Sequence, residues 1–188
     1  MNEQELISSL QKGDSQAFKL LVNTWQHMVY NTVLGIVQDV QEAEDTAQEV
    51  FIQVYQSVGG FRGESKLSTW LYRIAVTKAL DAERKKKSKK RMANLKSWIG
   101  LGENEEAIHF HHPGVQLDNK ELSGILFSAM QKLPENQRIA FTLVKTEGLA
   151  YEEVADIMQI SIKAVEALMH RAKENLRKKL QHYYSNHQ

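Results

Sequence analysis

The chain has 188 residues, of which 42% are hydrophobic and 25% charged, and its formal net charge at pH 7 is only +1. This composition is typical of a globular protein with one medium domain or two small ones, and no apolar run approaches the roughly 20 residues of a membrane helix. The lack of cysteine excludes disulfides and thiolate metal sites and predicts a reducing, cytoplasmic setting, while the polar first residues predict no secretory signal.

Charge is distributed unevenly along the chain. Residues 1–60 carry eight acidic and two basic side chains, whereas residues 78–91 carry eight basic and two acidic ones. A second basic segment, residues 161–188, carries six basic and two acidic side chains. Two cationic segments on a nearly neutral chain favour contacts with a long polyanion such as nucleic acid. The alternative interpretation of a Lys-rich run is the solvated end of a helix.

Helical periodicity dominates residues 1–90. Residues 3–11 predict a short helix, Asp14 is a candidate N-cap for a second, and the segment from Asp39 to Glu42 resembles the capping box of a third. A fourth helix follows the polar loop 62–65 and ends in the basic run that closes at Arg91. Four helices with short connections predict a bundle.

The third and fourth helices each have a predicted core side. On the third helix this side comprises Ala47, Val50, Phe51, Val54, Tyr55 and Val58. On the fourth it comprises Leu67, Trp70, Leu71, Ile74 and Ala75. The opposite face of the fourth helix carries Tyr72, Arg73, Val76, Thr77, Lys78, Asp81 and Arg84. A helix that leaves its core as a cationic rod is suited to holding a polyanion.

Residues 92–118 break the helical pattern. Glycines, a proline and an acidic cluster predict a flexible linker with a short helix near residues 95–99. The linker contains His109, His111 and His112. We interpret these histidines as polar linker residues, because a metal site needs ligands held in place by a scaffold and by hydrogen-bonding partners.

Residues 151–180 predict a helix-turn-helix, with a short helix, a three-residue break at 159–161 and a longer basic helix. Ala155 is small enough for close helix approach, and Ser161 can cap the longer helix. The inner side of the longer helix comprises Val165, Met169, Ala172, Leu176 and Leu180. Its outer side carries Lys163, Glu166, Ala167, His170 and Arg171. A plain helical hairpin is the alternative. The predicted fold is therefore all-α, with two small helical domains joined by a flexible linker.

Two segments of the chain resemble one protein family. Residues 43–81 resemble region 2 of bacterial sigma factors, and residues 133–180 resemble their region 4. With a linker where a third domain would lie, the chain is similar to the extracytoplasmic-function group of the sigma-70 family. The resemblance implies a region 2 domain at residues 1–91, a linker at 92–118 and a region 4 domain at 119–188. It implies a cytoplasmic protein that is not an enzyme and has no cofactor or metal. Its partners would be core RNA polymerase and promoter DNA, with an anti-sigma factor as a further candidate.

The resemblance also implies roles for individual residues. The polymerase-binding residues would be Asp45, Gln48 and Glu49. The residues that bind the promoter −10 element would be Phe61, Arg62, Gly63, Glu64, Ser65, Lys66, Tyr72, Arg73, Thr77, Lys78 and Arg84. Phe61 and Tyr72 are equally well explained as core aromatics. The residues that bind the −35 element would be Ser161, Lys163, Glu166, Ala167, His170 and Arg171.

The chain departs from the family pattern at several positions. Thr77 stands where the family usually has Asn, and Ala150 stands where it often has a capping Ser. Basic residues are common in the family near Glu166 and Leu168, which are acidic and apolar here. These departures leave the promoter sequence open.

Two other functions are compatible with parts of the sequence. A helix-turn-helix regulator that binds duplex DNA without polymerase would explain residues 119–180, but it would not explain the basic, aromatic-bearing segment 61–91. A hydrolase could use Asp81, Glu83 and the linker histidines. However, these carboxylates lie among eight cations, and no pairing of a nucleophile with a base is visible.

Overall fold

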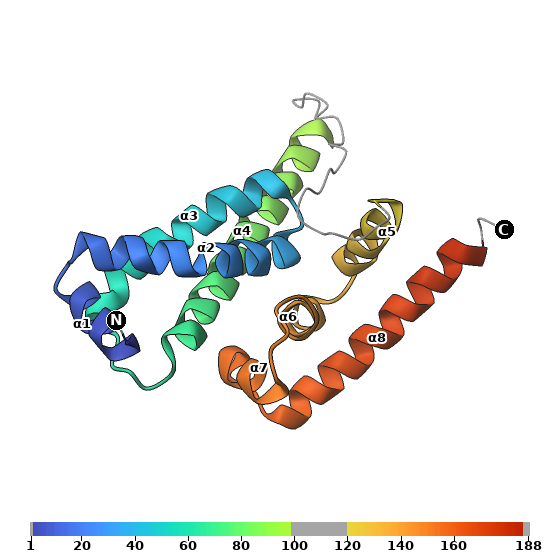
Figure 1. The fold of residues 1–188 in the computed structure, drawn as a ribbon. Helices are drawn as coiled ribbons and strands as arrows, with labels where there is room; N and C mark the ends of the chain where they lie inside the picture. The colour runs from blue at the N-terminus through green and yellow to red at the C-terminus, as the bar shows by residue number, and fades with distance from the viewer. Residues whose placement is uncertain (1, 99–119, 186–188) are drawn as a thin grey trace.

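A computed structural model describes residues 2–98 and 120–185, and these parts of the chain contain eight α-helices and no strand (Figure 1). The first four helices are α1 (Glu3–Gln11), α2 (Ser15–Val37), α3 (Val40–Ser57) and α4 (Leu67–Trp98). The last four are α5 (Lys120–Gln131), α6 (Glu135–Phe141), α7 (Tyr151–Met158) and α8 (Ile162–Ser185). A 3₁₀ turn, η1 (Val58–Gly60), follows α3, and a π-helical turn, η2 (Thr142–Thr146), follows α6. The all-α prediction is confirmed.

The predicted caps begin the helices of the N-terminal bundle. The Asp14 carboxylate accepts hydrogen bonds from the backbone N–H groups of Gln16 at 2.8 Å and Ala17 at 3.4 Å. Asp39 accepts from the N–H of Glu42 at 3.1 Å and pairs with Lys86 of α4 at 2.8 Å. Burial raises the pKa of Asp39, but its hydrogen bonds with Lys86 and the α3 backbone outweigh that effect and hold it below its ordinary value.

Helices α2, α3 and α4 surround one apolar core, and α1 closes one end of it. Leu21, Val50 and Leu71, one from each of these three helices, are fully buried. The Glu3 carboxylate accepts a hydrogen bond at 3.0 Å from the N–H of Leu67, the first residue of α4. An acidic side chain at this position satisfies one of the unpaired donors at the start of a helix. Helix α4 is therefore fixed in the bundle from its first residue.

Helix α4 continues to Trp98, past the end predicted at residue 91. The segment 92–98 contains no glycine or proline and includes Met, Ala, Leu and Lys, which have high helix propensity. The short helix expected near residues 95–99 is therefore, as far as Trp98, a continuation of α4. The rest of the predicted linker, with His109, His111 and His112, lies outside the described residues.

The C-terminal helices form a second unit around α8. Ala129, Met130 and Leu133 pack against Ala172 and Leu176 of α8 in a small apolar cluster. Helices α6 and α7 pack on the N-terminal half of α8. In this arrangement α7, the turn at 159–161 and α8 form the expected helix-turn-helix.

The two helical units pack against each other, whereas the sequence predicted two small domains joined by a flexible linker. One continuous apolar core includes Ala79 of α4, Leu143 of η2 and Val154 of α7. Helix α2 approaches the C-terminal unit closely at Gly35, whose carbonyl accepts a hydrogen bond from the Thr142 hydroxyl at 3.3 Å. Figure 1 shows α6 and α7 beside α4.

No described helix is both long and apolar enough to cross a membrane.

The neighbouring residues Leu20 and Leu21 provide a matched test of the α2 orientation. Leu21 is 0% exposed and Leu20 is 43% exposed. Leu21→Ala should lower the free energy of unfolding by about 2–5 kcal/mol, because it leaves a cavity in the core. Leu20→Ala should lower it by less than about 1 kcal/mol. Urea denaturation measures both, and equal losses would contradict the packing of α2.

Candidate nucleic-acid interface

The N-terminal half of α8 presents the outer side that the sequence predicted. Ser161 caps the helix, since its hydroxyl accepts a hydrogen bond from the N–H of Ala164 at 3.2 Å. The inner residues Val165 and Met169 are buried. The side chains expected to face outward are all exposed, namely Lys163, Glu166, Ala167, His170 and Arg171. This surface matches the shape and polarity of a recognition helix.

The turn before α8 is held by backbone geometry. Gln159 has a left-handed φ of 55°, and the N–H of Ile160 donates to the carbonyl of Ala155 at 3.1 Å. Ala155 is buried, as its expected place between the helices requires. Ala150 has no side-chain acceptor to cap α7, but the Glu153 carboxylate accepts from its N–H at 3.1 Å. The Glu153 side chain therefore makes one of the two hydrogen bonds of a capping box, and the bond that a serine side chain would make is missing.

One exposed face of α3 combines acidic, polar and apolar side chains. Asp45, Gln48 and Glu49 are exposed, as their place opposite the core side predicted. Tyr55 was expected in the core but is 58% exposed. Its ring makes an edge contact with Phe18 of α2, with centroids 5.1 Å apart, which holds it at the rim of the bundle.

Ile52 extends this α3 face and is missing from the sequence-based assignment. It is 57% exposed and lies four residues after Gln48 and three before Tyr55. This spacing places the three side chains on one side of the helix. The same spacing in the sequence could have identified Ile52. An acidic helix face with two exposed apolar side chains is suited to binding another protein.

The loop before α4 is mostly exposed, with one aromatic anchor beneath it. Arg62, Glu64 and Lys66 are exposed. Gly63 is also exposed and has a φ of 70°, a conformation that favours glycine. Phe61 is buried, with its ring centroid 5.0 Å from that of Trp70. Of the two roles considered for Phe61, the structure places it as a core aromatic beneath the loop.

The face of α4 that was expected to be open is covered by the C-terminal unit. Tyr72 is 7% exposed and Val76 is 9% exposed, so their predicted outward position is wrong. Both belong to the apolar core that includes Val154 and Ile157 of α7. Periodicity assigned them to the outer face because the N-terminal bundle alone leaves that face uncovered.

Polar contacts tie the same face of α4 to the C-terminal unit. The Arg73 guanidinium donates to the backbone carbonyl of Asp156 from Nη2 at 2.8 Å and from Nε at 3.2 Å. Lys66 lies 3.7 Å from a carboxylate oxygen of Glu153. Thr77 is exposed, and its hydroxyl donates to the carbonyl of Arg73 at 2.8 Å. Ser65 and Lys78 are half-buried.

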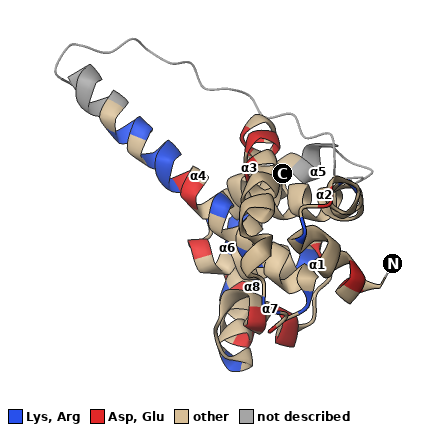
Figure 2. Ribbon diagram, turned by 90° about the vertical axis from the view of Figure 1, so that its left-hand side faces the viewer, with Lys and Arg blue, Asp and Glu red and all other residues tan. Residues whose placement is uncertain are grey.

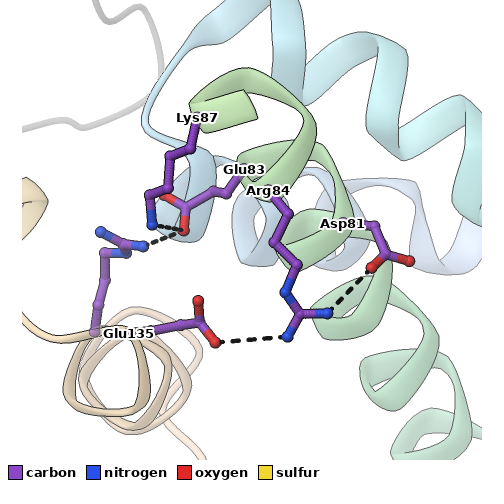
Figure 3. Close-up of polar contacts among 6 residues, drawn as sticks. Asp81, Glu83, Arg84, Lys87 and Glu135 are labelled. Atoms are coloured by element: carbon purple, nitrogen blue, oxygen red, sulfur yellow. Dashed lines mark hydrogen bonds and ion pairs between the residues drawn. The ribbon is translucent and has the colours of Figure 1, made fainter. Parts of the chain in front are cut away.

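Charged side chains link α4 to α6 further along the helix (Figure 3). Arg84 lies between Asp81 at 3.4 Å and Glu135 at 3.9 Å. Glu83 pairs with Lys87 at 3.7 Å and with Arg138, which is only 4% exposed. Each of the carboxylates considered for a hydrolase therefore takes part in an ion pair. Beyond this network, Figure 2 shows the Lys and Arg residues of α4 along the segment that projects from the bundle.

Glu147 is a half-buried residue between the two units. Its oxygen Oε2 accepts a hydrogen bond from the Tyr72 hydroxyl at 3.2 Å. Burial raises the pKa of Glu147 to about 7, although the hydrogen bond from Tyr72 opposes the shift. Burial and the nearby Glu147 carboxylate raise the pKa of Tyr72. Within residues 2–98 and 120–185, no group of three or more His, Asp or Glu is arranged to hold a metal ion.

Known families and proteins match the chain over most of its length. The Sigma-70 region 2 family matches residues 21–89, and the Sigma-70 region 4 family matches residues 123–176. The chain is 36% identical over 181 residues to the RNA polymerase sigma-H factor of Pseudomonas aeruginosa, covering 95% of this chain and 94% of that one. It is 35% identical over 186 residues to the ECF RNA polymerase sigma-E factor of Escherichia coli K12, covering 96% and 95%.

Solved structures share the fold. CnrH, in complex with the cytosolic domain of CnrY, matches with a TM-score of 0.69 and 20% identity over 95% of this chain and 97% of that chain. The sigma factor RpoE of Bartonella quintana, in complex with the anti-sigma factor NepR, matches with a TM-score of 0.62 and 22% identity over 87% and 96%.

The Tyr72 hydrogen bond gives a measurable prediction for Glu147. Tyr72→Phe removes a donor that lowers the pKa of Glu147, so this pKa should rise above its wild-type value of about 7. Carbon-13 NMR titration of the Glu147 carboxyl measures the change. A wild-type titration midpoint near the ordinary 4.5 would show that the carboxyl is solvated and that the two units do not meet as described.

Proposed function

The chain belongs to the extracytoplasmic-function group of the sigma-70 family, and from this premise we propose which domain carries out each step of transcription initiation. It binds core RNA polymerase and directs promoter-specific initiation. We assign polymerase binding, −10 recognition and melting to residues 1–91, and −35 recognition to residues 119–188, with a linker at 92–118. The observation that supports this assignment is that region 2 and region 4 of the family match one chain, with region 2 first.

Further features of the chain follow from the same family. We propose that it acts as a binding subunit, with no catalytic residue and no cofactor of its own. The cytoplasm, where polymerase and promoter DNA meet, is its proposed location. Its partners are core polymerase and promoter DNA, and we propose an anti-sigma factor as a further partner.

The exposed face of α3 is the proposed polymerase-docking surface. Asp45, Gln48 and Glu49 supply its polar part, and Ile52 and Tyr55 supply exposed apolar area beside them. A surface of this kind provides both electrostatic steering and apolar burial in a protein complex.

Charge reversal tests this surface. The double variant Asp45→Lys with Gln48→Lys should weaken co-purification with core polymerase and leave the fold intact, because both side chains are exposed. The matched control is Gln131→Lys with Glu174→Lys, which makes the same change in net charge at exposed positions of the C-terminal domain. Equal recovery of polymerase by both double variants would remove α3 from the docking surface.

The loop before α4 and the adjacent face of α4 form the proposed −10 site. A flipped base needs a pocket, polar groups for its edge and cations for the flanking phosphates. We propose that Phe61 supports the loop from below while its other residues contact the strand, and that one face of α4 continues the site. These contact residues are Arg62, Gly63, Glu64, Ser65, Lys66, Tyr72, Arg73, Thr77, Lys78 and Arg84.

Replacement of Arg62, Glu64 and Lys66 by Ala should affect melting more than polymerase binding. The pocket offsets a few kcal/mol of unstacking, so the triple variant should form fewer open complexes on duplex promoters. A template already mismatched at the −10 element avoids the unpairing cost and should recover part of the loss. Permanganate reactivity of unpaired thymines measures opening. If the triple variant melts duplex promoters normally, the loop only connects two helices and has no role in promoter opening.

The outer side of α8 is the proposed −35 reader, with Ser161, Lys163, Glu166, Ala167, His170 and Arg171. A carboxylate such as Glu166 can accept a hydrogen bond from a cytosine amino group in the major groove, whereas Arg171 can hold a phosphate. Glu166→Lys should therefore change the bases selected from random upstream sequences. Arg171→Ala should lower occupancy, with a smaller dependence on salt. Identical selected sequences for the wild type and Glu166→Lys would exclude Glu166 as a base reader.

A further inference from the structure

The proposed −10 loop, residues 61–66, has little hydrogen bonding of its own. Within residues 2–98 and 120–185, the backbone of residues 62–65 makes no hydrogen bond. The contact of Phe61 with Trp70 fixes one aromatic side chain at the start of the loop, but it does not fix the path of the residues that follow. The position of the exposed loop side chains is therefore set mainly by how the two ends of the loop are held.

Helix α1 holds the beginning of the loop. The side-chain amide of Gln11 donates from Nε2 to the carbonyl oxygen of Phe61 at 2.8 Å and lies 3.5 Å from the carbonyl oxygen of Val58. The N–H of Phe61 donates to the same Val58 carbonyl at 3.1 Å. Both backbone groups of the first loop residue are therefore paired, and one of the two partners comes from α1.

The same helix holds the residue that follows the loop. The Glu3 carboxylate accepts a hydrogen bond from the N–H of Leu67 at 3.0 Å. Leu67 is 0% exposed and begins α4, so its N–H would otherwise be one of the unpaired donors at the start of a helix. One short helix thus makes a hydrogen bond at each end of the loop.

Helix α1 is itself a fixed support. Leu6 and Leu10 are buried in the apolar core of the N-terminal domain. The first turn of α1 is closed by a capping box, in which Asn2 accepts from the N–H of Glu5 at 2.8 Å and Glu5 accepts from the N–H of Asn2 at 2.9 Å. Because α1 is anchored in this way, its hydrogen bonds to the loop restrict the loop and not the helix.

We propose that α1 positions the −10 loop, with Glu3 and Gln11 as positioning residues that sharpen the choice of bases at the −10 element. The inference rests on the proposed −10 role of the loop. Hydrogen bonds to base edges require a narrow range of distance and angle, and they carry the sequence information, whereas phosphate contacts carry none directly. A loop that loses one of its supports should therefore lose sequence preference more than total affinity for DNA.

Two pairs of variants separate these hydrogen bonds from charge and packing. Glu3→Gln keeps a side-chain oxygen that can accept from the N–H of Leu67, whereas Glu3→Met does not, and both lose the same charge. Gln11→Met removes the amide donor at nearly the same side-chain length. Gln4→Met makes the identical change on α1 at a residue whose side chain makes no hydrogen bond among the described residues. Glu3, Gln4 and Gln11 are exposed, so the fold should persist.

Each variant is assembled with core polymerase, and its affinity is measured by fluorescence anisotropy for two DNA single strands. One strand is selected by the wild-type holoenzyme from random −10 sequences, and the other is a scrambled strand of the same composition. A loss of folded protein lowers both affinities alike, so their ratio reports the position of the loop and not stability. Glu3→Met and Gln11→Met should each lower the ratio about fivefold if the loop then holds its productive position in about one-fifth of the molecules. Glu3→Gln and Gln4→Met should keep the wild-type ratio.

A wild-type ratio in both Glu3→Met and Gln11→Met would overturn the inference. An equal loss in Glu3→Gln and Glu3→Met would also overturn it, because charge and not the hydrogen bond would then be responsible. The triple replacement of Arg62, Glu64 and Lys66 by Ala separates this inference from the proposed function. If the triple variant keeps the wild-type ratio, the proposed −10 role of the loop is wrong and the inference fails with it. If the triple variant loses the ratio while Glu3→Met and Gln11→Met keep it, only the inference is overturned.

Discussion

The close approach of α2 to η2 determines how the two domains meet. Because Gly35 presents only a backbone, Thr142 reaches its carbonyl, and α6 and α7 then lie against α2 and α4. The π-helical turn contributes to this placement, since the N–H of Glu147 donates to the carbonyl of Thr142 five residues earlier. Glu147 is thereby brought under Tyr72. The cover over α4 depends on this geometry.

Opposing forces act at the interface between the two domains. Apolar residues of both domains share one core, which favours closure. Arg138 and Glu147 carry polar groups into that core, and the desolvation of these groups opposes closure. The exposed pair of Lys66 and Glu153 adds little in high dielectric.

Local signals in the sequence predicted local structure well. Asp14 and Ser161 were identified as caps because a cap depends on residues two or three positions away. Tyr55 and Tyr72 were placed on the wrong sides because their partners, Phe18 and Glu147, are distant in sequence. Helical periodicity shows which side chains share a face of a helix, but it does not show which other element covers that face. The family resemblance predicted which segments bind DNA, whereas the contact between these segments became visible only in three dimensions.

Zero-length carbodiimide cross-linking tests most directly whether the two domains meet as described. Lys66 and Glu153 lie 3.7 Å apart across the domain interface, whereas Lys86 and Asp39 lie 2.8 Å apart within the N-terminal domain. In the free chain, mass spectrometry should find both cross-links within single molecules. Formation of the Lys86–Asp39 cross-link without the Lys66–Glu153 cross-link would contradict the account.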